Sequence, residues 1–151
     1  MKKIISILAA VTLIFNLPII ANANEANITD TCQSKAIVDL GNGLIVEYSI
    51  SESTPNARAN TKTATKTATC KLKDGTVVAT IKLTATFSYT GSSATCTSAS
   101  SNYSLTQGWS YSDRITTRSG NTATTSAKFA KGFSSATITV TMTCSNSGVI
   151  S

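Results

Sequence analysis

A two-residue alternation of apolar and polar side chains between residues 76 and 89 constrains this chain more than any other feature. Successive side chains of a β-strand point to opposite faces, so this period predicts a strand with one buried and one solvated face. Residues 135–144 repeat the alternation, with threonine at every second position. The β-branched residues that dominate both segments favour strands over helices. The apolar face of the first segment carries Val77, Ala79, Ile81, Leu83, Ala85, Phe87 and Tyr89.

Turn signals between these segments set the expected strand registers. Asp74-Gly75 is a strong two-residue hairpin signal, and it pairs Leu72 with Val77 and Cys70 with Ala79. All four side chains then fall on the apolar face, so this register agrees with the alternation.

A second tight hairpin is expected at Gly91-Ser92, where it pairs Phe87 with Cys96. Cys96 then points inward, as Cys144 does at the end of the other alternating segment. Two inward cysteines on strands that are distant in sequence can bridge two stacked sheets.

The turn at Gly120-Asn121 allows two registers. A two-residue loop places Ile115 opposite Ser126, whereas a three-residue loop with a bulge places Ile115 opposite Ala127. We favour the longer loop because it gathers the larger apolar residues on one face. That face would carry Tyr111, Ile115, Ala127 and Phe129.

The rest of the chain reads as further strands and loops. Lys131-Gly132 is expected as another tight turn, with Ala127 opposite Ala136, and Gly41-Asn42-Gly43 as the link between two short strands. About eight strands result, which is enough for a small sandwich or barrel. We therefore expect an all-β fold, an antiparallel immunoglobulin-like β-sandwich stabilised by disulfides. Its additional strands are expected at 35–40, 44–51 and 61–73, and its loops at 51–60 and 98–107.

The N-terminal segment predicts export. Met1-Lys2-Lys3 is a positive start, residues 4–20 are nearly all apolar, and Ala21-Asn22-Ala23 matches a signal-peptidase site. The alternative is a permanent membrane anchor, which the cleavage signal disfavours. We expect a signal peptide at 1–23, a flexible segment at 24–34 and one domain at 35–151. The product would be secreted and extracellular, without stable membrane insertion after cleavage.

Four cysteines, at positions 32, 70, 96 and 144, indicate two disulfides in an exported protein. Four cysteines allow three pairings. Strand parity favours Cys96–Cys144, and Cys32–Cys70 then follows by elimination. None of the cysteines has C-x-x-C spacing, so a zinc ribbon or a redox centre fits poorly.

Two motifs stand out in the segment from Thr61 to the end. They are F-x-Y-x-G-S-x-A-x-C, ending at Cys96, and T-x-T-C, ending at Cys144. With them, the segment resembles small secreted Thr/Ser-rich β-sandwich proteins of anaerobic Gram-positive bacteria, which have no assigned activity. The resemblance implies a Cys96–Cys144 bridge and no catalytic residue. The order Cys96, Trp109, Cys144 also resembles immunoglobulin domains in part, although Met142 stands where their conserved Tyr would lie.

The composition excludes much of the usual catalytic chemistry. The chain has no histidine, which rules out Ser-His-Asp and Cys-His catalytic groups. Asp39 and Glu47 could be cross-strand neighbours able to hold calcium, but solvated charges are the simpler interpretation. We expect no enzyme activity, no cofactor and no metal. The net charge is +6 with basic residues spread singly, a pattern that does not indicate nucleic-acid binding.

Three aromatic residues, Tyr103, Trp109 and Tyr111, gather around one connection and are the candidate ligand contacts. We expect Trp109 to be buried and Tyr103 to be exposed. The favoured function is a secreted, monomeric, non-enzymatic protein that binds a cell-surface, matrix or host ligand through its loops, with a cell-surface glycan or protein as the possible partner. The alternative is a secreted antagonist, bacteriocin-like or toxin-like, and an extracellular hydrolase comes third. A pilus-type subunit would need a donor strand, for which residues 24–34 are the free segment.

Overall fold

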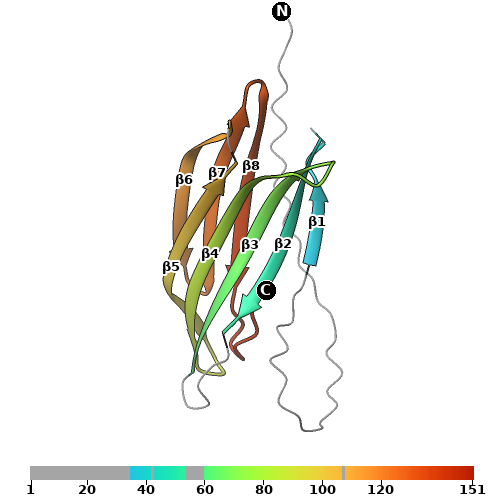
Figure 1. The fold of residues 1–151 in the computed structure, drawn as a ribbon. Helices are drawn as coiled ribbons and strands as arrows, with labels where there is room; N and C mark the ends of the chain where they lie inside the picture. The colour runs from blue at the N-terminus through green and yellow to red at the C-terminus, as the bar shows by residue number, and fades with distance from the viewer. Residues whose placement is uncertain (1–34, 42, 54–59, 107) are drawn as a thin grey trace, which may run out of the picture.

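The computed structural model describes residues 35–41, 43–53, 60–106 and 108–151, and this part of the chain is built from antiparallel strands (Figure 1). The expected signal peptide and the segment 24–34 lie outside the described residues. Eight strands occur in the described part, as the alternation predicted. They are β1 (Lys35–Asp39), β2 (Leu44–Glu52), β3 (Thr61–Leu72), β4 (Val77–Tyr89), β5 (Ala94–Leu105), β6 (Ser110–Ser119), β7 (Thr122–Lys131) and β8 (Ser134–Thr143).

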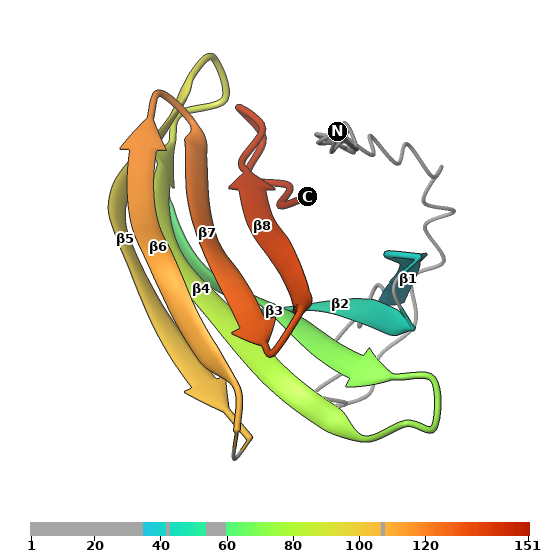
Figure 2. The same cartoon turned by 90° about the horizontal axis from the view of Figure 1, so that it is seen from above.

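The strands form two sheets that face each other (Figure 2). The first sheet has the order β1-β2-β3-β4-β5 and the second has the order β6-β7-β8. Neighbours in each sheet are neighbours in sequence, whereas immunoglobulin domains distribute their strands between the sheets by Greek-key crossings. Within the described residues, no helix is long and apolar enough to cross a membrane.

The core lies between the sheets and is built from alternate residues of the strands. On β4 the inward row runs from Ala79 to Phe87, as predicted, and on β8 it runs from Ile138 to Met142. The outward row of β4 is polar and half-buried or exposed. Side chains that are almost completely buried include Leu44, Val46, Ile81, Leu83, Phe87, Phe129, Val140 and Met142.

The hairpin between β3 and β4 confirms part of the expected register. Cys70 lies opposite Ala79, as predicted, but the pairing of Leu72 with Val77 is wrong. A bulge after Cys70 places Lys71 opposite Val77 instead. As a result Val77 is exposed, and its neighbour Val78 is buried. The hairpin between β4 and β5 pairs Phe87 with Cys96, as predicted.

The hairpin between β6 and β7 corrects the sequence interpretation. Its loop is the shorter one, with Ser119 opposite Thr122 and Ile115 opposite Ser126. The expected bulge exists, but it lies within β6, between Ser112 and Ile115, rather than in the loop. Ile115 is therefore 57% exposed and does not share a face with the buried Phe129.

Two further expectations were wrong. The turn between β7 and β8 pairs Lys131 with Ser134, one residue later than predicted, so Phe129 rather than Ala127 lies opposite Ala136. Residues 98–107 are not an exposed loop, because β5 continues to Leu105. The short polar side chains of β5 suggested a loop, yet every second residue faces the core or a neighbouring strand.

Candidate binding surface

The three aromatic residues singled out in the sequence come together at one end of the molecule. The connections β1–β2, β3–β4, β5–β6 and β7–β8 all lie at this end, the upper one in Figure 1. We call it the aromatic end. It comprises Tyr103 from β5, Trp109 from the β5–β6 connection, Tyr111 and Arg114 from β6, and Lys131 and Phe133 around the β7–β8 turn.

Tyr103 is half-buried rather than exposed, and its hydroxyl joins the two sheets. It lies 2.6 Å from the Thr125 hydroxyl and accepts a hydrogen bond from Ser101 at 3.0 Å. Burial alone would raise the pKa of Tyr103, but hydrogen bonds with these hydroxyls and the nearby Arg114 charge outweigh it and lower the pKa. The hydroxyl is thus a structural group that links the two sheets.

Tyr111 and Arg114 form the polar-aromatic centre of this surface. The ring centroids of Tyr103 and Tyr111 are 5.5 Å apart, and the Arg114 guanidinium carbon lies 4.5 Å from the Tyr111 centroid. Arg114 also donates a hydrogen bond to the Tyr111 hydroxyl at 3.2 Å. Tyr111 packs edge-on against Phe129 in the core, with centroids 6.2 Å apart. A cation over an aromatic face is a favourable contact that holds both side chains in place.

The bulge in β6 positions Arg114. Asp113 has a φ of 52°, in the left-handed region, where it is the one non-glycine residue among those described. Aspartate tolerates this region better than most residues, and the Asp113 carboxylate accepts a hydrogen bond from Ser112 at 3.1 Å. The extra residue reverses the side-chain alternation along the strand. Tyr111 consequently faces Phe129, while Arg114 reaches back over its ring.

Trp109 is half-buried and packs against the core, which agrees only in part with the burial expected for it. Its backbone N–H donates to the Thr106 carbonyl at 3.2 Å and closes a tight turn at Gly108. The stem of Lys131 lies against this glycine, where an added Cβ would be 3.3 Å from the lysine. The β5–β6 turn and the β7–β8 turn are therefore neighbours.

Phe133 was missed by the sequence interpretation, and it is the most exposed apolar side chain described. It projects from the β7–β8 turn with a relative exposure of 111%. The predicted turn at Lys131-Gly132 placed Phe133 inside the next strand and concealed it. A bulky aromatic directly after a turn glycine was the signal that could have located it.

Asp39 and Glu47, the two acidic residues considered as a calcium pair, do not face each other in the structure. Asp39 accepts the Gly41 N–H at 2.8 Å and lies 3.7 Å from Lys73, whereas Glu47 pairs with Lys71 at 2.8 Å. Although both carboxylates belong to the β1–β2 hairpin, each is directed to a lysine. In the described part of the chain, no three acidic or cysteine residues cluster in a way that could hold a metal ion.

Cys96 and Cys144 lie away from the aromatic end. Cys96 and Cys144 are both buried, as strand parity predicted, and both are free thiols in the structure. Their backbone N–H groups donate to successive carbonyls of the β6–β7 turn, Cys96 to Gly120 at 2.7 Å and Cys144 to Asn121 at 3.0 Å. Burial raises the pKa of both thiols, and the proximity of Cys96 raises that of Cys144 further. The two residues are thus neighbours across the sheets.

The other expected pair cannot be placed in the same way. Cys32 lies outside the described residues. Cys70 is a buried free thiol on β3, and burial raises its pKa to about 11. It lies close enough to Tyr48 on β2 to raise the pKa of that phenol, which burial already raises.

Comparison of the chain with protein-family models, with curated proteins and with solved structures finds no match.

Proposed function

We propose that this chain is a secreted, non-enzymatic binding protein that recognises a cell-surface, matrix or host ligand through its aromatic end. The observation that carries the proposal is the fully exposed Phe133 at the same end of the molecule as the Tyr103–Tyr111–Arg114 cluster. An exposed aromatic side chain costs solubility, and such residues commonly anchor ligands or partners.

The chemistry of the aromatic end favours a glycan or a protein partner that carries negative charge. Tyrosine and tryptophan rings offer apolar faces with polar edges, suited to the mixed surface of a sugar or a protein. Arg114, over the Tyr111 ring, and Lys131, against Gly108, add positive charge to this end. Arg114 is held by Tyr111, so it can meet a carboxylate with little further loss of side-chain freedom.

Secretion and disulfide stabilisation belong to the same proposal. In an oxidising compartment, the Cys96 and Cys144 thiols would lose two protons and two electrons to an external thiol oxidant and form one disulfide. Their shared attachment to the β6–β7 turn supports this pairing. Each thiol now donates to a nearby carbonyl, Cys96 to Ser98 and Cys144 to Ser145, so a side-chain rotation would precede bonding.

Binding of the labelled chain 24–151 to intact cells and isolated cell walls tests the proposed function. We expect saturable binding that persists at moderate salt, because aromatic contacts are not screened by ions. Binding that disappears as salt is raised would reduce the interaction to charge attraction and overturn the proposal.

One observation also favours the alternative, a secreted antagonist. The fully exposed Phe133 follows Lys131 at the tip of a hairpin, a combination that suits insertion into an anionic membrane surface. In that case the chain would release dye from vesicles rich in phosphatidylglycerol and inhibit the growth of neighbouring bacteria. Intact vesicles and unaffected growth would exclude this alternative.

A further inference from the structure

The second sheet ends in an edge strand, β8, which pairs with β7 on one side and, within the described residues, with no strand on the other. Both the N–H and the C=O of Thr143 pair with Ser151 on the side away from β7. Because backbone groups alternate along a strand, those of Thr141, Thr139 and Thr137 point to the same side. In the described part of the chain, no strand pairs with β8 along these three residues. Such a row of backbone groups is a template for another strand.

Two side chains of the larger sheet contact this edge. The Lys66 ammonium of β3 donates to the Thr141 carbonyl at 2.8 Å, and the Tyr48 hydroxyl of β2 donates to the Thr139 carbonyl at 3.5 Å. Neither contact engages the N–H groups of the edge. Lys66 is half-buried, and it points into the space between the sheets. Among the described residues these N–H donors have no partner strand, and a positive charge lies beneath them.

The larger sheet extends past the smaller one on this side. Close backbone approaches between the sheets involve β3, β4 and β5, while β1 and β2 continue outward (Figure 2). The inward row of β2 is nevertheless apolar. It consists of Leu44, Val46, Tyr48 and Ile50. Leu44 and Val46 are already buried, so a further strand beside β8 would lie over the half-buried Tyr48 and Ile50.

We propose that residues 24–34 of a second copy of this chain add to the free edge of β8 as an antiparallel strand. The segment alternates in sequence. One face would carry Ala26, Ile28, Asp30 and Cys32, and the other Asn27, Thr29, Thr31 and Gln33. Its charged side chains are Glu25 and Asp30, both acidic, so it complements the basic groups under the edge.

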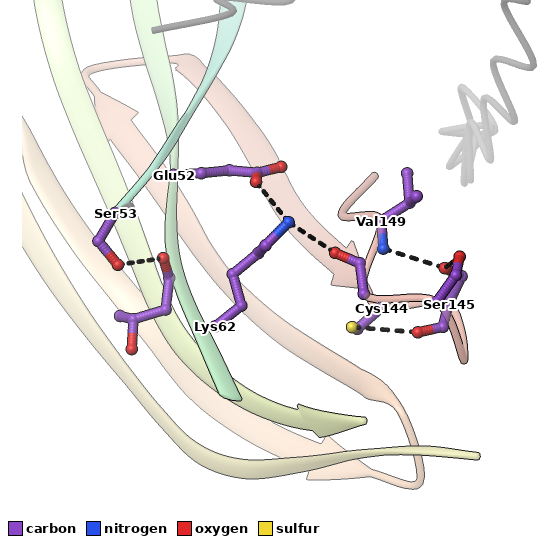
Figure 3. A network of polar contacts seen from close by, with 9 residues as sticks. Glu52, Ser53, Lys62, Cys144, Ser145 and Val149 are labelled. Carbon is purple, nitrogen blue, oxygen red and sulfur yellow. Dashed lines mark hydrogen bonds and ion pairs between the residues drawn. The ribbon is translucent and has the colours of Figure 1, made fainter. Parts of the chain in front are cut away.

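Strand addition would leave neither the Thr141 carbonyl nor Lys66 without a hydrogen-bond partner. A backbone N–H of the added strand replaces Lys66 at the Thr141 carbonyl, and Lys66 is then free to pair with Asp30. Lys62, a second inward lysine of β3, is already engaged by Glu52 at 2.9 Å and by the Gly148 carbonyl at 2.7 Å (Figure 3). Asp30 would thus meet Lys66 as its partner beneath the edge of β8. Main-chain bonds would supply affinity, and alternate side chains would supply specificity.

Strand direction indicates a second copy rather than the same molecule. The arrows of β1 and β8 point in opposite directions (Figure 1). A segment antiparallel to β8 therefore runs in the same direction as β1. Since residue 34 directly precedes Lys35 at the start of β1, the segment would finish at the wrong end of its own molecule. This assembly is independent of the proposed ligand binding, because the aromatic end is not involved.

The test is the oligomeric state of the chain 24–151, which light scattering measures over a concentration series with a reducing agent present. We expect concentration-dependent assembly. Thr139→Pro should abolish it, because proline removes an outward N–H without removing a bond to β7. Thr139→Ala, which keeps this N–H, should assemble like the parent chain.

Variants of the segment itself leave the eight strands untouched. Ile28→Lys should weaken assembly at least tenfold, whereas Thr29→Lys, with the same charge change on the opposite face, should alter it less than twofold. Lys66→Met tests whether Lys66 pairs with Asp30 or instead blocks the edge by occupying the Thr141 carbonyl. We expect assembly to weaken, because the pair with Asp30 is lost. If Lys66 only blocked the edge, its replacement would strengthen assembly. A chain that stays monomeric at all concentrations, as first expected from the sequence, would overturn the proposal, as would oligomers indifferent to Thr139→Pro.

Discussion

At the scale of single residues, one hydroxyl network ties the two sheets together. Thr125 of β7 is a fully buried polar residue, and its hydroxyl lies 2.6 Å from that of Tyr103 and 3.0 Å from that of Thr116. It also donates to the Ile115 carbonyl at 3.0 Å. No buried side-chain polar atom among the described residues lacks a partner. A polar group in this position specifies how the sheets meet, because losing one partner leaves another unsatisfied.

The substitution Tyr103→Phe tests this network. We expect it to lower the free energy of unfolding by about 1–2 kcal/mol, because it removes a hydrogen bond from a buried hydroxyl. Tyr111→Phe is the matched control. The Tyr111 hydroxyl contacts the exposed Arg114, so its loss should cost less than about 0.5 kcal/mol. Urea denaturation measures both, and equal losses would contradict the assignment of Tyr103 as the bridge.

At the scale of elements, the turn after β8 fastens the C-terminal residues to the larger sheet. The Gly148 carbonyl accepts a hydrogen bond from Lys62, and Gly148 lies directly against the ring of Tyr89. A Cβ at this position would be 2.6 Å from the Tyr89 ring, closer than real contacts allow. With a φ of 83°, Gly148 also occupies the left-handed region.

Gly148→Ala should therefore destabilise the chain more than alanine at an unobstructed glycine. Gly75 has a φ of 89° and open space around its Cβ direction, so Gly75→Ala reports the backbone cost alone, about 1 kcal/mol. We expect Gly148→Ala to cost at least about 2 kcal/mol in chemical denaturation, since the ring must also move. Similar losses in the two variants would show that Tyr89 does not constrain the turn.

At the scale of strands, some registers could be predicted from the sequence and others could not. The alternation along β4 and β8 could be predicted, because a one-residue error would expose a whole apolar row. The bulges after Cys70 and beside Asp113 could not, since the turn sequences allow more than one register. Each bulge changes which residues face outward, and that explains the errors at Val77 and Ile115.

Only part of the candidate binding surface could be predicted from the sequence, because local backbone irregularities place its other residues. The grouping of Tyr103, Trp109 and Tyr111 follows from their places in the sequence. In the structure the rings of Tyr103 and Tyr111 are in contact, and Trp109 packs against the same core. Arg114 joins them only because the β6 bulge turns it back over Tyr111. Phe133 was hidden by a turn placed one residue too early. In both cases, the missing information was a local backbone irregularity.

At the scale of the whole molecule, the proposed Cys96–Cys144 disulfide would link the two sheets. It would close a long loop that contains β6, β7 and β8. Closure of a loop of this size contributes about 4 kcal/mol in the chain-entropy model. For a domain with few large apolar residues, this is a substantial share of the total stability.

Reduction of the exported chain should therefore lower its Tm by more than about 10 °C. A Cys96→Ser/Cys144→Ser variant should show the lowered Tm from the start and lack most of the response to reductant. Cys70→Ser serves as the control, and reduction should still lower the Tm of this variant by most of the decrease seen in the parent chain. Thermal unfolding followed by circular dichroism, with thiol counting by mass spectrometry, gives the result. An unchanged Tm after complete reduction would contradict the disulfide proposal.

The most direct measurement of the central claim is the affinity of the chain 24–151 for cells, compared between Phe133→Ser and Val149→Ser. Both side chains are exposed and apolar, but Val149 lies in the C-terminal turn at the opposite end of the molecule. If the aromatic end binds the ligand, Phe133→Ser should weaken binding at least tenfold, and Val149→Ser less than twofold. Equal affinities for the two variants and the parent chain would contradict binding through the aromatic end.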